Sequence, residues 1–127
     1  MSSENLHVPR EKLSQEARLL HHAITSLKEE LDAVDWYRQR ADDTEDEELK
    51  QILLHNMREE MEHASMVLEW IRRNSKEFGG HLRTYLFTEG SILAIEDAAE
   101  GGDEKGGAKE SRKPGSKGFT VGPLKGE

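Results

Sequence analysis

The clearest pattern in the chain is a row of apolar residues that recurs at alternating intervals of four and three positions. Its members are Leu13, Ala17, Leu20, Ile24, Leu27, Leu31 and Val34. This spacing places side chains on one face of a helix, and no glycine or proline interrupts the residues between Pro9 and Ala41. Pro9 suits the first turn of a helix, where its missing N–H would have no partner. The pattern predicts a first helix from Pro9 to about Ala41.

A second row has the same spacing, but polar residues occupy three of its positions. Its members are Leu49, Leu53, Asn56, Glu60, His63, Val67 and Trp70. Glu60 and His63 are three residues apart, so a helix places them side by side. A buried carboxylate is costly unless it is paired or holds a metal. This face of a second helix is therefore either hydrated or in contact with a cation.

Each of these helices carries another apolar row beside the first. On the first helix this row is Leu20, Ala23, Leu27, Glu30, Val34 and Tyr37, in which Glu30 is the one charged residue. On the second helix it is Met57, Met61, Ala64, Leu68 and Ile71. Two adjacent rows make each helix apolar over a wide face, which predicts that each packs against a partner.

The two helices are expected to form an antiparallel hairpin. The residues 42–44 break the first helix, and Thr44 followed by Glu47 has the pattern of a capping box. The second helix is expected from about Glu45 to Asn74, with Gly79-Gly80 ending it. A connection this short makes the helices antiparallel neighbours. A two-helix hairpin cannot bury all its apolar faces alone, so an all-α dimer with a four-helix bundle is predicted.

The remainder of the chain divides into three predicted parts. Residues 81–99 complete the helical domain (1–99) with a shorter helix that Gly90 bends or splits. Eight of the 11 glycines lie in residues 101–127, which predicts a flexible linker over 100–116. Apolar residues return in the last segment, 117–127, at Phe119, Val121 and Leu124. A short apolar segment after a long linker is typical of a docking peptide.

Charge and composition exclude several classes of function. The net charge of −8 and pI near 5.3 argue against nucleic-acid and anionic-membrane partners, which require a basic surface. The chain contains no cysteine, so any metal would be held by oxygen and imidazole. No signal-peptide pattern is evident, and no stretch approaches the roughly 20 apolar residues of a membrane span. A cytoplasmic protein is expected.

The polar residues of the two helices correspond to half of a di-iron site. Ferritin-like bundles use one Glu from each of two helices and a Glu-x-x-His pair from each of two others. Glu30 and the pair Glu60 and His63 supply one of each, and in a hairpin they lie at similar distances from the turn. A two-fold-related copy would complete the set around two metal ions, for which carboxylates with one imidazole per metal suit iron or manganese. An exposed polar face is the ordinary alternative for a Glu-x-x-His pair, but the position on an apolar row and the matching Glu30 favour a metal site.

Other charged residues of the two helices support weaker predictions. His55, Glu59 and Glu62 share another face of the second helix, where an exposed polar surface is favoured over weak cation binding. Glu29 and Asp32, beside Glu30, form either an acidic approach to the metal or a hydrated surface.

The chain resembles the encapsulated ferritins, the ferritin-like cargo of encapsulin nanocompartments. The matching runs cover about residues 20–97, and the most specific is His81-Leu82-Arg83-Thr84-Tyr85-Leu86-Phe87-Thr88-Glu89-Gly90. Other matching runs are Glu29-Glu30-Leu31, Ala33-Val34-Asp35-Trp36-Tyr37, Glu59-Glu60, Glu62-His63-Ala64 and Leu68-Glu69-Trp70. The tail Phe119-Thr120-Val121-Gly122-Pro123-Leu124 resembles an encapsulin-targeting peptide, with Phe and Pro where Leu and Ser are common.

This resemblance implies a ferroxidase that oxidises Fe(II) inside an encapsulin compartment for iron storage or detoxification. It implies that Glu30, Glu60 and His63 bind two irons per homodimer and that five dimers form an annular decamer. It also implies an iron-approach site at Glu29 and Asp32, with Trp36 and Tyr37 near the centre. A weaker outer-surface site would comprise His55, Glu59 and Glu62. The alternatives are a non-enzymatic helical metal-binding assembly or adaptor and an iron buffer.

Overall fold

The computed structural model describes residues 6–105, and every regular element in this range is helical. A 3-10 turn, η2 (Arg10–Lys12), precedes α1 (Gln15–Asp43) and α2 (Glu47–Asn74). The helices α3 (Lys76–Tyr85) and α4 (Ile92–Lys105) follow. The chain divides into two compact units after Ser75. The predicted all-α class and long hairpin are confirmed, and no helix in the described range is long and apolar enough to cross a membrane.

The first long helix begins later than its apolar pattern predicted. Pro9 caps the separate 3-10 turn, and Leu13 is extended, with φ −88° and ψ 141°. The Ser14 hydroxyl then accepts a hydrogen bond from the Ala17 N–H at 3.0 Å. A serine at this position satisfies an otherwise unpaired N–H of the first turn. The predicted start at Pro9 is therefore wrong, and α1 starts at Gln15.

The turn between the long helices uses a different cap from the one predicted. The helix α1 continues to Asp43, and Thr44 follows it in an extended conformation. The Asp46 carboxylate accepts the Leu49 N–H at 2.9 Å, so Asp46 is the N-cap of α2. The predicted capping box between Thr44 and Glu47 is wrong. A carboxylate at the N-cap both accepts a hydrogen bond and complements the positive end of the helix dipole.

The second long helix ends before the glycine pair. Ser75 is extended, with φ −125° and ψ 103°, and its N–H donates to the Ile71 carbonyl. The Asn74 side chain donates to the Trp70 carbonyl at 2.9 Å, which satisfies another acceptor of the last turn. Gly79-Gly80, predicted to end α2, instead lie inside α3.

Residues beyond α3 follow the predicted split. Gly90 has φ +91°, a backbone conformation that glycine adopts at little cost, and it separates α3 from α4. The Ser91 hydroxyl accepts the Ala94 N–H at 3.1 Å and caps α4. Because α4 continues to Lys105, helix extends into the segment predicted as a linker. The predicted docking peptide, 117–127, lies outside the described residues.

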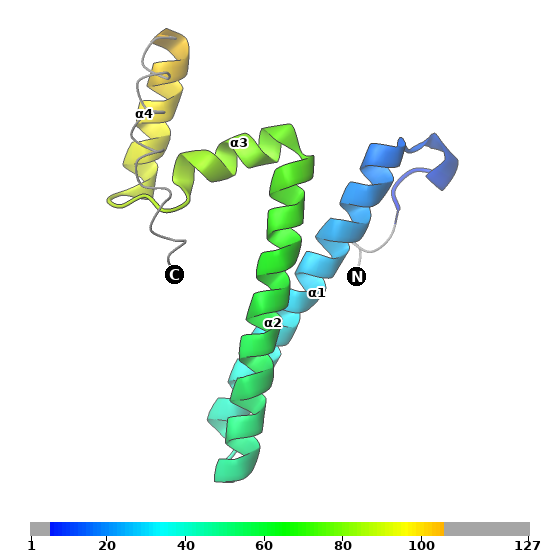
Figure 1. The fold of residues 1–127 in the computed structure, drawn as a ribbon, viewed down its shortest axis with the longest axis vertical. Helices are drawn as coiled ribbons and strands as arrows, with labels where there is room; N and C mark the ends of the chain where they lie inside the picture. The colour runs from blue at the N-terminus through cyan, green and yellow to red at the C-terminus, as the bar shows by residue number, and fades with distance from the viewer. Residues whose placement is uncertain (1–5, 106–127) are drawn as a thin grey trace. The chain divides into compact units, whose positions relative to one another are not determined.

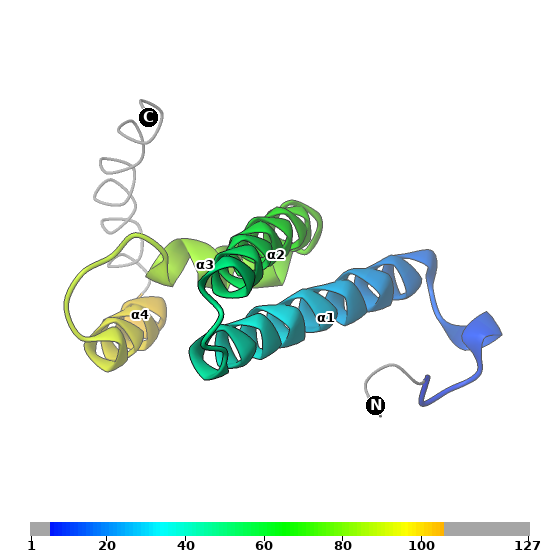
Figure 2. The same ribbon diagram turned by 90° about the horizontal axis from the view of Figure 1, so that it is seen from below.

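The hairpin buries only part of one apolar row of α2. Its buried residues are Met57, Ala64 and Ile71, which recur every seven positions, whereas Met61 of the same row is 46% exposed. The polar-interrupted row of α2 lies beside them, and Leu31 on α1 is 53% exposed. In Figures 1 and 2 the two helices are close at the turn and diverge away from it. Apolar side chains of both long helices, among them Ile24 and Ile52, also remain exposed.

Candidate metal centre

Three potential metal ligands from the two long helices come together in the hairpin. Glu30 lies on α1, and Glu60 and His63 lie one turn apart on α2. One ligand atom of each lies within 4.8 Å of the other two. Glu30 and Glu60 meet because the helices are antiparallel and both residues lie near the middle of their helices. We call these three residues the half-site.

The half-site is compact and open to solvent. His63 Nδ1 lies 3.4 Å from Glu60 Oε1 and 3.7 Å from Glu30 Oε1. The side chains of Glu30 and Glu60 are 26% and 25% exposed, and that of His63 is 47% exposed. Both carboxylates are therefore partly shielded from water, while the imidazole remains accessible. All three donors are thus open to a cation from solvent.

The two carboxyl groups perturb one another. A hydrogen bond to Glu60 is the main cause that raises the pKa of Glu30, with partial burial and the Glu60 charge adding to it. The same hydrogen bond lowers the pKa of Glu60, and His63 lowers it further. The pair thus retains a proton on Glu30 more readily than an isolated glutamate does. A cation at this position would replace that proton and remove the repulsion between the carboxylates.

The chemistry of the donors fits iron. Two carboxylates and one imidazole are the hard and intermediate ligands that suit Fe or Mn. Three donors leave coordination positions open for water or for residues of another chain. Carboxylate oxygen also stabilises the more highly charged Fe(III) relative to Fe(II). The half-site is therefore a candidate position for a metal ion, and iron is among the ions that suit its donors.

The weaker predicted sites do not gather in this way within one chain. His55 Nε2 lies 3.8 Å from Glu59 Oε2, but the half-site is the only cluster of three such donors found in the described residues. Glu62 is exposed further along α2, and Glu29 and Asp32 are exposed on α1. The two metal sites predicted at these five residues remain predictions, because neither set brings three donor atoms together within one chain.

The two aromatic residues predicted near the centre both lie on α1 close to Arg40. Trp36 is half exposed and lies with Gln39 and Arg40 along a shallow hollow on α1. The Arg40 guanidinium lies 5.5 Å from the centroid of the Tyr37 ring. This distance permits a cation–π contact. The roles of Trp36 and Tyr37 at the metal remain predictions.

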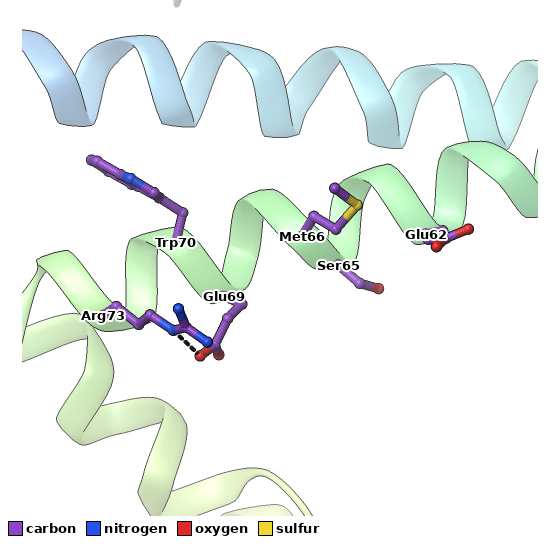
Figure 3. Close-up of a pocket in the computed structure, with 6 residues that line it drawn as sticks. All are labelled: Glu62, Ser65, Met66, Glu69, Trp70 and Arg73. Atoms are coloured by element: carbon purple, nitrogen blue, oxygen red, sulfur yellow. Dashed lines mark hydrogen bonds and ion pairs between the residues drawn. The ribbon is translucent and has the colours of Figure 1, made fainter. Parts of the chain in front are cut away.

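A charged cluster near the end of α2 was not singled out from the sequence. Arg72 Nε and Arg73 Nε lie 2.8 Å and 2.6 Å from the Glu69 carboxylate. These hydrogen bonds lower the pKa of Glu69 to about 2. Figure 3 shows Glu69 and Arg73 along a hollow beside Met66 and Trp70, with Trp70 directed toward α1. The spacings of three and four residues could have revealed this cluster.

A long antiparallel hairpin that presents two carboxylates and a histidine defines a ferritin-like type of helical protein with a candidate metal site. The chain belongs to the EncFtn-like family, which matches residues 5–89. It is 52% identical to an encapsulated ferritin-like protein of Rhodospirillum rubrum, over 99% of this chain and 91% of the relative. It is 37% identical to the encapsulin nanocompartment cargo protein EncC of Myxococcus xanthus, over 60% of this chain and 57% of that protein.

A solved structure supports the same fold. The crystal structure of a protein from Nitrosomonas europaea is similar with a TM-score of 0.67 and 52% sequence identity. The match covers 69% of this chain and 97% of that structure. The resemblance first noted from sequence runs is therefore confirmed at the level of the family.

Proposed function

We propose that this protein oxidises Fe(II) to Fe(III) at a di-iron centre formed between two chains. The observation that carries the proposal is the half-site, whose three ligand atoms lie within 4.8 Å of one another. Membership of a ferritin-like family supports iron as the substrate. Two copies related by a two-fold axis supply four carboxylates and two imidazoles, the set used in ferritin-like di-iron bundles.

The ligands favour the oxidised product. Each iron loses one electron, so two adjacent irons supply the two electrons that dioxygen accepts together. In one chain Glu30 and Glu60 provide anionic oxygen for the resulting Fe(III), and His63 fixes the ion on the α2 side. Glu29 and Asp32 would attract Fe(II) on its approach. His55, Glu59 and Glu62 would bind metal more weakly on the outer surface.

Matched variants of the same helix test the activity. We expect Glu60→Gln and His63→Ala to lower the rate of aerobic Fe(II) oxidation at least about tenfold, since each removes a ligand that the oxidised ion needs. Glu48→Gln removes an exposed carboxylate at the start of α2 and should oxidise iron at the wild-type rate. Stopped-flow absorbance after addition of Fe(II) provides the measurement. Wild-type rates in both half-site variants, or binding of Fe(II) without oxidation in the wild type, would contradict the proposal.

We further propose that the product is delivered inside an encapsulin shell. The relatives from R. rubrum and M. xanthus are described as encapsulated and as an encapsulin cargo protein. The terminal residues Phe119, Val121 and Leu124 would bind the shell, and five dimers would form an annular decamer.

Removal of residues 117–127 tests the shell interaction separately. The truncated protein should fail to load into a co-expressed encapsulin while it oxidises Fe(II) at the wild-type rate, because the half-site lies elsewhere in the chain. Loading is measured by purification of the shell and quantification of its cargo. Undiminished loading of the truncated protein would show that these residues are not the docking peptide.

A further inference from the structure

The exposed face of α4 has an apolar end and an acidic end. Ile92 and Leu93, in the first turn, are 64% and 73% exposed. Glu96, Asp97 and Glu100 follow Leu93 at intervals of three, four and seven residues, so a helix places them on the same face. All three carboxylate residues are exposed. We call Leu93, Glu96, Asp97 and Glu100 the α4 face.

The acidic part of this face has no counter-charge in the described structure. None of the ion pairs found among the side chains of residues 6–101 involves Glu96, Asp97 or Glu100. Residues 92–101 contain no lysine or arginine. Like charges three and four residues apart on a helix repel one another. Positive charges along this face would therefore offset the repulsion among the three carboxylates.

The sequence that follows α4 has the complementary order of properties. Residues 106–118 include four basic residues and one acidic residue, although the whole chain has a net charge of −8. The basic residues are Lys109, Arg112, Lys113 and Lys117. The apolar residues Phe119, Val121 and Leu124 come next. A segment that turned back along α4 would therefore meet acidic residues with its basic part and Leu93 with its apolar part.

The length of this segment matches the distance it must cover. The helix α4 has 14 residues and is about 20 Å long at the helical rise. The stretch 106–118 has 13 residues, and a glycine-rich chain of that length has a root-mean-square end-to-end distance of about 20 Å. A chain that leaves α4 at Lys105 can thus bring Phe119 back to the first turn of the helix at little entropic cost.

We propose that residues 106–125 dock in an antiparallel direction on the α4 face of the same chain. The basic residues contact Glu96, Asp97 and Glu100, and Phe119 and Val121 cover Ile92 and Leu93. The occupant is the chain's own C-terminal segment. Its basic charge and its order of basic and apolar residues complement the α4 face, and its length suffices to reach the first turn of α4. The consequence for shell binding rests on the proposed function: the docked segment is masked until the shell competes for it.

Cysteine cross-linking tests the docked state in the full-length protein. The chain contains no cysteine, so Ala94→Cys with Thr120→Cys introduces a single reactive pair. A short bis-maleimide should link the pair efficiently. The matched control adds Lys109→Glu, Arg112→Glu, Lys113→Glu and Lys117→Glu, which keep the length of the segment but reverse its charge. The yield should fall about fivefold in this control and also in 1 M salt, where charges are screened within about 3 Å.

Two outcomes would overturn the proposal. Equal yields in the original and the charge-reversed backgrounds would show that the link records only random encounters. Mixing isotopically light and heavy chains before assembly identifies the source of the segment by mass spectrometry of linked peptides. Links between light and heavy chains in statistical proportion would show that the segment docks on another copy, whereas links within one isotope support the proposal.

The masking effect has its own measurement. A triple variant should release the segment from α4; it carries Glu96→Gln, Asp97→Asn and Glu100→Gln. When this variant and wild-type chains compete for a limited amount of shell, the variant should load more. Equal loading of the two proteins, with the cross-link intact in the wild type, would refute masking. If neither protein entered a shell, the proposed shell partner would be refuted. The cross-link yields would still decide whether the segment docks.

Discussion

Glu29 and Glu30 are adjacent on α1, yet they have different environments. Glu30 faces Glu60 and His63 across the hairpin, and the hydrogen bond to Glu60 raises its pKa. Glu29 is exposed on the outside of the helix. The difference follows from the helical rotation of about 100° between consecutive residues. The two glutamates therefore allow a controlled comparison, because they have the same side chain and differ in whether it faces the half-site.

We expect Glu30→Gln to weaken Fe(II) binding at least about tenfold, since the amide keeps the shape but loses the anionic ligand. Glu29→Gln should weaken it by less than about threefold, because its charge acts at longer range through water. Anaerobic isothermal titration calorimetry with Fe(II) measures the affinity of both variants. Equal losses for the two variants would indicate a diffuse electrostatic effect in place of direct coordination.

The individual helices show how local chemistry sets the ends of the hairpin. Ser14 and Asp46 cap α1 and α2, while the Glu69 carboxylate holds Arg72 and Arg73 in the last turns of α2. Arginines at this end also complement the negative end of the helix dipole. The end of α2 is thus stabilised by an ion-pair network that responds to pH.

The pKa of Glu69 is lowered from 4.5 to about 2, so the folded state binds its proton less readily than the unfolded chain does. The network therefore contributes stability above pH 4.5, and this contribution is lost as the pH falls toward 2. Because Glu69 is 41% exposed, we expect wild type to exceed Glu69→Gln by no more than about 1 kcal/mol at pH 7. The difference should vanish near pH 2.

Chemical denaturation followed by circular dichroism, without metal, measures this dependence. Asp42→Asn provides the control, since Asp42 pairs with Arg38 at 3.7 Å with both side chains well exposed. Its effect on the free energy of unfolding should be small at every pH. A Glu69→Gln difference that persisted at pH 2 would show that packing, and not the ion pairs, is responsible.

Much of the hairpin could be predicted from sequence, because apolar spacing reports which residues face a partner helix. The same reasoning placed Glu30, Glu60 and His63 together, since two regular helices and a short turn fix their relative levels. The ends of the helices were less predictable. Several neighbouring residues could cap each helix. Ser14 and Asp46 are the N-caps, in place of Pro9 and Thr44, because they accept backbone hydrogen bonds that the apolar pattern does not reveal.

At the scale of the whole molecule, two features of the hairpin support the proposed dimer. Its half-site has three donors, and apolar residues such as Leu31 remain exposed on its surface. A second chain would address both needs, because it supplies further ligands and covers the apolar rows. Metal binding and association are then thermodynamically linked.

Iron should therefore shift the protein toward its assembled state, and chelation should shift it back. In the proposed dimer, the acidic ligands of the two chains would repel one another without a cation. Native mass spectrometry before and after chelation gives the distribution of species. The Glu60→Gln variant, which removes one negative charge from each half-site, should respond less to iron. An unchanged mass distribution in the wild type would separate assembly from metal binding.

The proposed division of the site between two chains has a kinetic consequence. If neither chain is competent alone, the initial rate of iron oxidation in dilute solution rises with the square of the protein concentration and becomes linear only when dimers dominate. A chain released at low concentration would be nearly inert, and confinement in a small volume would turn it on. The open half-site of the hairpin would thus restrict a potentially damaging reaction to places where the protein is crowded.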